Sequence, residues 1–155
     1  MRYILALALL LIAAPAMARD SLGVFGEWGA FRDADVPRCY AIAAPDGSSS
    51  GYASVGNWPD QQVRGQVHFR LSRPLRSGTQ ARLTIAGRSF TLTSRGSDAW
   101  SANRQGDAAI VAAMRSASAM QVTGRDRQGR AFTDRYSLAG AATALDAASV
   151  GCARG

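Results

Sequence analysis

Residues 65–74 read GQVHFRLSRP, and this stretch decides the fold. Val67, Phe69 and Leu71 alternate with polar residues, and Pro74 closes the run. An alternation with a period of two is typical of a strand with one buried face, as in an antiparallel sheet. Because proline cannot donate to a sheet ladder, Pro74 is expected to end the strand. The stretch therefore predicts a half-buried antiparallel strand with its polar side chains in solvent.

The segments on either side repeat the β pattern. Residues 81–96 (ARLTIAGRSFTLTSRG) predict a hairpin with Gly87 in its tight turn. Residues 120–138 (MQVTGRDRQGRAFTDRYSL) predict a second hairpin that turns near Gln128–Gly129. Three earlier strands are expected at residues 26–33, 38–45 and 52–59.

One segment breaks the β pattern and predicts a helix. In GDAAIVAAMRSASAM (106–120), Asp107 is a natural N-cap. The apolar residues that follow fall at helical spacing and should pack on a sheet. They are Ile110, Ala113, Met114 and Ala117. Residues 140–152 (GAATALDAASVGC) predict a short alanine-rich C-terminal helix.

The expected fold class is therefore mainly β. We predict an antiparallel β-sandwich, or a half-open barrel, with one packed α-helix and a short C-terminal helical segment. By length, residues 19–155 form a single domain. The three tryptophans are interpreted as core or sheet-edge anchors, with ligand stacking as the alternative. They are Trp28, Trp58 and Trp100.

The N-terminus predicts export. Arg2 precedes an apolar run that Pro15 ends, and small residues surround a cleavage position after Ala18. This pattern is typical of a secretory signal peptide over residues 1–18, and a membrane anchor is the alternative. The run is shorter than the roughly 20 residues that span a bilayer, and no transmembrane segment is expected in the mature chain. The predicted location is the periplasm, the cell surface or the medium.

The two cysteines predict one disulfide. Export places the chain in an oxidising compartment, where paired cysteines persist as disulfides. With two cysteines only one pairing exists, between Cys39 and Cys152, and it would tie the C-terminus back to an early strand. Two free thiols are the alternative. Two cysteines and one histidine do not make up a zinc ligand set, so no metal site is expected.

The basic charge comes from arginine alone, and it is unevenly placed. The chain has no lysine and a formal net charge of +7. Between Gln61 and Ser97 there are seven arginines and no acidic residue. We expect three of them on the solvent face of one sheet, as a candidate site for an anionic partner. They are Arg70, Arg82 and Arg88. The alternative is a solvated arginine-rich face without a partner.

The sequence offers no catalytic constellation. GSSSG (47–51) matches the G-x-S-x-G pattern, but the strand and helix that a nucleophile elbow needs are not expected around Ser49. His68 is the sole histidine, and it is expected on an exposed strand position. Phosphate-binding, calcium-binding, zinc-protease and dinucleotide motifs are absent from the sequence. We therefore predict no catalytic residue and no cofactor.

Several stretches together resemble the invasion-associated locus B family of exported proteobacterial proteins. They are EWGAFRDADVPRCYAI, AGRSFTLTSRGSDAWSANRQGDAAIVAAMRSASAMQV, DRYSLAG and the alanine-rich end that closes on Cys152. The resemblance is best from Leu83 to Cys152. It implies a small periplasmic or surface-associated β-sandwich without catalytic machinery. The family's basic turn between the last two strands corresponds here to GRDRQGRAF, which carries extra polar residues.

These observations predict a non-enzymatic envelope protein that acts as a binding module. Its expected partner is an anionic macromolecule of the envelope or of a host surface, or another protein, and not nucleic acid. The alternative is an enzyme or accessory factor acting on cell wall or glycan, with a concave pocket near His68 or Asp98–Trp100. A structural or chaperone-like component that binds strands at a sheet edge is a third hypothesis.

Overall fold

The computed structural model describes residues 19–47 and 50–153. The predicted signal peptide, residues 1–18, lies outside the described residues. The strands are β1 (Arg19–Phe25), β2 (Trp28–Asp33), β3 (Arg38–Ala43), β4 (Tyr52–Trp58), β5 (Val63–Arg70), β6 (Arg82–Ile85), β7 (Arg88–Thr91), β8 (Thr93–Arg95), β9 (Asp98–Trp100), β10 (Ala119–Arg125) and β11 (Ala131–Ser137). The helices are η1 (Pro59–Gln61, a 3-10 helix), α1 (Arg104–Met114) and α2 (Ala141–Ala153).

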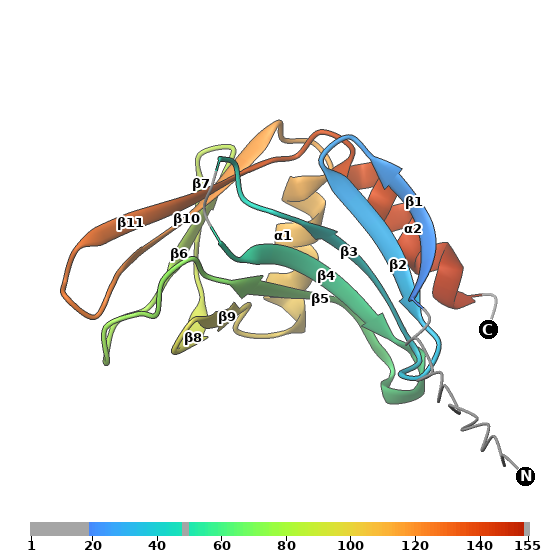
Figure 1. Cartoon of the computed structure of the whole chain (residues 1–155), viewed down its shortest axis with the longest axis horizontal. Coiled ribbons are helices and arrows are strands. Elements are labelled where there is room, and N and C mark those ends of the chain that lie inside the picture. Colours follow the sequence, from blue (N-terminus) through green and yellow to red (C-terminus); the bar gives the residue numbers. More distant parts are fainter. Residues whose placement is uncertain (1–18, 48–49, 154–155) are drawn as a thin grey trace, which may run out of the picture.

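The strands form two antiparallel sheets in a sandwich-like arrangement (Figure 1). The larger sheet has seven strands in the order β1-β2-β3-β4-β5-β9-β8, and the smaller has four in the order β11-β10-β6-β7. One hydrophobic core joins them, and the ring centroids of Phe69 on β5 and Tyr136 on β11 lie 6.1 Å apart. The prediction of a mainly β, sandwich-like fold is confirmed.

Strand β5 alternates as its sequence predicts. Val67 and Phe69 are fully buried, while His68 is half-buried and Arg70 is exposed. The strand ends at Arg70, before Pro74, and the Leu71 backbone N–H then donates to the Ser97 carbonyl at 2.7 Å. Alternation therefore identified the buried face correctly, whereas proline was a poor guide to the end of the strand.

Two strands of the larger sheet, β1 and β9, were not predicted, and β8 was predicted only as part of the hairpin over residues 81–96. Strand β1 has no buried residue, so it lacks the apolar face that a sequence pattern would reveal, and its register with β2 shifts between Ser21 and Gly23. Strands β8 and β9 have only three residues each, too few to show a period. Between β7 and β8 the chain crosses from the smaller sheet to the larger one at Leu92, which is fully buried.

Helix α1 begins earlier than predicted. Its N-cap is Asn103, whose side chain accepts the Gly106 N–H at 2.9 Å, and not Asp107. Asp107 lies within the first turn and accepts the backbone N–H of Val67 at 2.9 Å, which ties the helix to β5. Three members of the predicted apolar stripe are confirmed, since Ile110, Ala113 and Met114 are buried. The fourth, Ala117, lies beyond the end of the helix and is half-buried.

Helix α2 covers one end of the larger sheet, and the predicted disulfide joins it there. Cys152 of α2 bonds to Cys39 of β3, with the two Cα atoms 5.7 Å apart. At its start, Gly140 has a φ of +84°, and a side chain on it would overlap the Phe25 carbonyl, so glycine is required there. Helix α2 spans Ala141–Ala153 and matches the segment predicted over residues 140–152 to within one residue at each end. None of the helices in residues 19–47 and 50–153 is long and apolar enough to cross a membrane.

Candidate anion-binding site

The three arginines predicted to form one face are divided between the two sheets. Arg70 lies on β5 of the larger sheet, whereas Arg82 and Arg88 lie on β6 and β7 of the smaller one. The register places Arg88 opposite Ile85, which is buried, and Arg82 next to the buried Leu83. Side chains directly opposite share a face and neighbours alternate, so Arg82 and Arg88 start on opposite faces of their hairpin. The prediction of a single arginine face was wrong.

Arg70 is also paired with an acidic residue. Its Nη1 donates to Asp98 Oδ2 at 2.7 Å, and His68 Nε2 lies 3.0 Å from Asp98 Oδ1. Burial opposes ionisation of Asp98, but the hydrogen bonds from Arg70 and His68 outweigh it and hold its pKa below the ordinary value. The His68 ring stacks on Trp100 at 5.3 Å between centroids. Arg70, His68, Asp98 and Trp100 therefore form a polar patch on β5 and β9 in which the charge of Arg70 is paired with a carboxylate.

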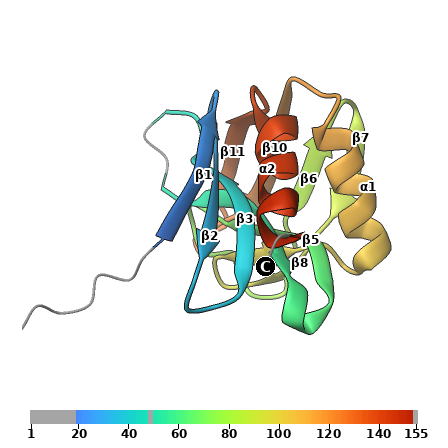
Figure 2. The same ribbon diagram turned by 90° about the vertical axis from the view of Figure 1, so that its right-hand side faces the viewer.

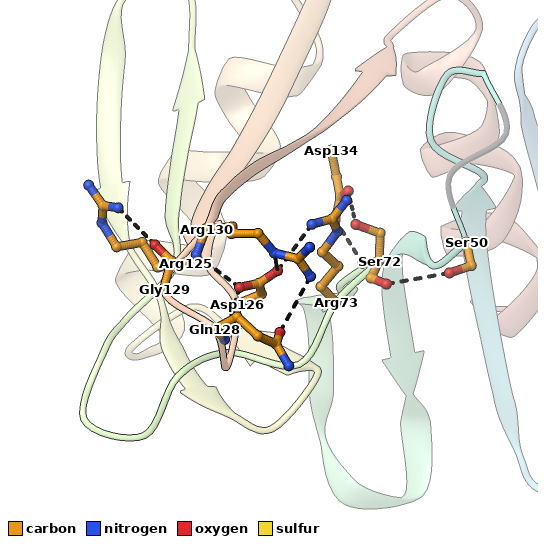
Figure 3. Close-up of polar contacts among 9 residues, drawn as sticks. All are labelled: Ser50, Ser72, Arg73, Arg125, Asp126, Gln128, Gly129, Arg130 and Asp134. Carbon is orange, nitrogen blue, oxygen red and sulfur yellow. Dashed lines mark hydrogen bonds and ion pairs between the residues drawn. The ribbon is translucent and has the colours of Figure 1, made fainter.

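Positive charge gathers instead at the tip of the β10–β11 hairpin and in the loop between β5 and β6. Five exposed arginines meet there, and we refer to them as the arginine cluster. They are Arg73, Arg76, Arg125, Arg127 and Arg130. Figure 3 shows three of them, Arg73, Arg125 and Arg130, around the hairpin turn.

Asp126 joins the hairpin turn to the loop. Its side chain is only 3 % exposed, and it accepts hydrogen bonds from both segments (Figure 3). Arg73 Nη1 reaches Asp126 Oδ2 at 3.0 Å from the loop, and Arg130 Nε reaches the same oxygen at 3.1 Å. The backbone N–H groups of Gln128 and Arg130 donate to Oδ1 at 3.0 and 2.9 Å. A single buried carboxylate thus fixes both the turn and two guanidinium groups.

These contacts keep Asp126 ionised. Burial opposes the charge, but the backbone N–H of Arg130, the Arg73 hydrogen bond and the Arg130 charge outweigh it. The pKa of Asp126 is therefore held below its ordinary value. The carboxylate provides one negative charge among five guanidinium groups, which leaves an excess of positive charge at the surface.

The other members of the cluster are placed by backbone contacts. The Arg76 backbone N–H donates to the Arg125 carbonyl at 2.9 Å, and Arg125 Nη1 donates to the Gly129 carbonyl at 3.0 Å. Arg76 Nη1 lies 3.5 Å from the position that a Cβ would take on Gly129. Loop and hairpin are therefore in direct contact, and their arginines form one surface.

A second buried carboxylate, Asp134, attaches the β5–β6 loop to β11. Asp134 of β11 is 1 % exposed and accepts hydrogen bonds from the Ser72 hydroxyl and, at 2.9 Å, from the Ser72 backbone N–H (Figure 3). Burial, with the Asp134 charge, raises the pKa of the neighbouring Tyr136 hydroxyl far above its ordinary range. Asp134 therefore serves the packing of the loop on β11.

The site has the chemistry of an anion receptor. Arg73 and Arg130 remain 48 % and 68 % exposed although each is paired with Asp126, so part of each guanidinium group is open to a ligand. Guanidinium groups bind carboxylates, sulfates and phosphates through paired N–H donors. Among the described residues, no group of three or more histidine, cysteine or acidic side chains is placed to hold a metal ion.

Sequence reasoning missed most of this cluster. Arg73 and Arg76 belong to the acid-free segment from Gln61 to Ser97, but the hairpin arginines lie far away in the sequence. The one signal that pointed to them was the basic turn GRDRQGRAF, noted through the family resemblance. The isolated bridge between Leu75 and Asp126 brings the two segments together, and no sequence pattern predicts that contact.

A comparison with known protein families, curated proteins and solved structures finds no match to this chain. The resemblance to the invasion-associated locus B family therefore rests on the residue patterns alone.

Proposed function

We propose that the protein is an exported, non-enzymatic binding module that holds an anionic macromolecule on the arginine cluster. The observation that carries the proposal is the convergence of five exposed arginines around one buried carboxylate. A surface of one sign attracts polyanions and speeds their encounter. Sulfated or phosphorylated glycans, from the envelope or from a host surface, have the oxyanions that such a surface binds.

Export is supported by two independent features. The N-terminal pattern of residues 1–18 is that of a secretory signal, and the Cys39–Cys152 disulfide suits an oxidising compartment. In such a compartment glycans and lipid headgroups are the abundant polyanions, and nucleic acid is not. A role as a binding module of the periplasm or cell surface follows.

Heparin provides a direct test because it is a sulfated glycan of high charge density. We expect the oxidised protein to bind heparin at low salt and to release it as salt rises, since salt screens exposed charges. The variant Arg76→Gln/Arg125→Gln/Arg127→Gln removes three arginines that do not pair with Asp126. It should bind about tenfold more weakly, a loss of roughly 1.4 kcal/mol.

The matched control removes the same charge elsewhere. Arg32→Gln/Arg82→Gln/Arg88→Gln takes three exposed arginines from outside the cluster and should leave affinity within about a factor of two of the wild type. Equal losses in the two variants would show that net charge alone drives binding. Heparin affinity that does not change with salt would reject the electrostatic site.

A glycan-acting protein is the second candidate, and one observation favours it. Tyr52 approaches the His68 ring edge-on at 5.5 Å between centroids, and His68 stacks on Trp100, on neighbouring strands of the larger sheet. Half-buried aromatic faces are suited to ligand contact. Under this hypothesis Trp100→Ala would abolish binding of an uncharged cell-wall oligosaccharide, whereas the arginine-cluster variant would not.

A further inference from the structure

A groove lies between the two helices, on the side of the molecule that Figure 2 presents to the viewer. There α1 and α2 run side by side in opposite directions, and β4 and β5 of the larger sheet supply further lining residues. The cavity has a volume of about 620 Å³. Pockets for small molecules span roughly 300–1,000 Å³, so the groove is large enough to hold one.

One stripe of each helix lines the groove. From α1 the lining includes Ala108 and Val111, and from α2 it includes Leu145 and Cys152. The two α1 positions lie three residues apart and the two α2 positions seven apart, so each pair shares a helix face. Cys152 brings the disulfide to the wall of the groove, and Val55 adds an apolar side chain from β4. The groove therefore has an aliphatic wall, while Asn57, Gln62 and Ser149 add polar groups to its lining.

Gly65 keeps the groove open toward β5. It has a φ of +66°, and a Cβ built there would meet only Val111 Cγ2, at 3.9 Å. The neighbouring strand positions Val63 and Arg64 also line the cavity. The space between β5 and α1 is therefore open at Gly65, next to the aliphatic wall.

The charged side chains that line the groove are all arginines. Three arginines line it, Arg64, Arg104 and Arg115, and none of its described lining residues is acidic. Arg115 Nη1 pairs with Asp146 Oδ1 at 2.8 Å, which bridges α1 and α2. Within residues 19–47 and 50–153, no carboxylate lies within 4.0 Å of the guanidinium of Arg64 or Arg104, and both residues are exposed.

The Arg115–Asp146 ion pair and Arg104 lie at opposite ends of α1. Arg104 is the first residue of the helix and Arg115 caps its other end. At 1.5 Å per residue the two are separated by roughly 16 Å along the axis. The groove is thus bridged at one end by an ion pair, while at the other end Arg104 remains available to a ligand.

We propose that this groove binds a single-chain amphiphile whose head is a carboxylate or a phosphate. The aliphatic walls would hold the chain, since burial of apolar surface drives such binding. The guanidinium group of Arg104, at the open end, would hold the head, because guanidinium matches both oxyanions through paired donors. Arg64, next to Gly65 and Val111, adds positive charge further along the groove. The absence of acidic side chains from the described lining selects against a cationic head.

This site is separate from the arginine cluster in residues and in ligand. None of the five cluster arginines lines the groove. The groove would take a small amphiphile, whereas the cluster would take a polyanion at an open surface. Either proposal can therefore fail without the other.

The first experiment compares head groups on one chain length. Dodecanoate, dodecyl phosphate, dodecyl maltoside and dodecyltrimethylammonium are titrated into the oxidised mature protein below their micelle-forming concentrations. We expect one anionic amphiphile per chain, bound at least about tenfold more tightly than the neutral or cationic one. The carboxylate and phosphate arms identify the preferred head. Equal affinity for all four, or no binding of either anion, would overturn the proposal.

The second experiment places the ligand in the groove. Ala108 is exposed and lines the cavity, so Ala108→Trp should block it and weaken dodecanoate or dodecyl phosphate binding at least about tenfold. Ala112 is exposed on the same helix but does not line the cavity, so Ala112→Trp is the matched control. Unchanged binding to Ala108→Trp, or the same loss in both, would overturn the assignment.

A charge variant keeps the test valid if the tryptophan variant does not fold. Arg64→Gln/Arg104→Gln changes only exposed side chains and should weaken the anions while leaving dodecyl maltoside unchanged. The control Arg76→Gln/Arg127→Gln removes the same charge from the arginine cluster and should leave amphiphile binding intact. Heparin binding should show the reverse pattern. If the groove pair leaves anion affinity unchanged, Arg104 does not hold the head.

Discussion

Asp126 is the residue on which the candidate anion site depends. It is 2 % exposed, yet it is surrounded by arginines from a loop and a hairpin that are distant in sequence. A buried carboxylate is tolerated only where hydrogen bonds and opposite charges replace the water it loses. The same contacts that keep Asp126 charged also hold Arg73 and Arg130 at the surface. The stability of the site and its charge pattern are thus linked at one side chain.

We predict that Asp126→Asn lowers the free energy of unfolding by about 1–3 kcal/mol, because it weakens several hydrogen bonds to a buried group. The pKa of Asp126 is below its ordinary value in the fold, so the stabilisation is present above the unfolded pKa. It is lost as pH falls through the folded pKa. Urea unfolding of wild type and variant should therefore converge in acid. Asp20→Asn, at an exposed position, should show no such effect.

At the scale of the elements, helix α1 shows both what sequence patterns capture and what they miss. Its apolar stripe was predicted, because burial against a sheet requires a regular spacing that is visible in the sequence. Its start was not, because Asn103 and Asp107 are both good N-cap residues and only tertiary contacts decide between them. The pairing of β5 with β9 covers only His68 to Arg70. Asp107 accepts the backbone N–H of the preceding residue, Val67.

The prediction at this scale concerns Asp107. Burial raises the pKa of its carboxyl, and the Val67 N–H only partly offsets this. Because the folded pKa lies above the unfolded one, ionisation destabilises the fold as pH rises through that window. Asp107→Asn keeps the acceptor oxygen and removes the charge, so its stability relative to wild type should rise from pH ~4 to neutrality. Asp60→Asn in η1 is the control, and an equal rise there would refute the account.

The buried faces of individual strands were predicted better than the way the strands are shared between the two sheets. Strands with a strict apolar alternation, such as β5 and β10, were identified with the correct buried faces. The division of the strands between two sheets was not predicted. Arg70 and Arg82 occupy similar alternating patterns although they lie in different sheets, and no local pattern shows that the chain crosses between sheets at Leu92. The prediction that Arg70, Arg82 and Arg88 share one sheet face was wrong for this reason. Membership of a sheet is a long-range property, whereas alternation is a local one.

At the scale of the whole molecule, the disulfide is the main constraint that sequence reasoning supplied. Cys39 and Cys152 are 113 residues apart, and the bond attaches α2 to β3 of the larger sheet. The second cysteine was easy to assign because there was only one partner for it. The core itself combines small, aliphatic and aromatic residues from both sheets and both helices.

We predict that Cys39→Ser/Cys152→Ser lowers the free energy of unfolding by roughly 4–5 kcal/mol, because the unfolded chain gains the entropy of a long open loop. Urea unfolding of wild type with and without a reductant provides the comparison. The reduced wild type should behave like the double variant, and the reductant should not change the double variant further. A difference of under about 1 kcal/mol would mean that the fold does not depend on the bond.

The same bond determines how the molecule responds to mechanical force. Strands β1 and β2 precede Cys39, whereas nearly everything else lies inside the closed covalent loop. A tether that pulls on the two ends of the oxidised chain extends only the residues before Cys39 and after Cys152. The β1–β2 ribbon can therefore peel away while the loop that carries the groove and the arginine cluster remains under no tension.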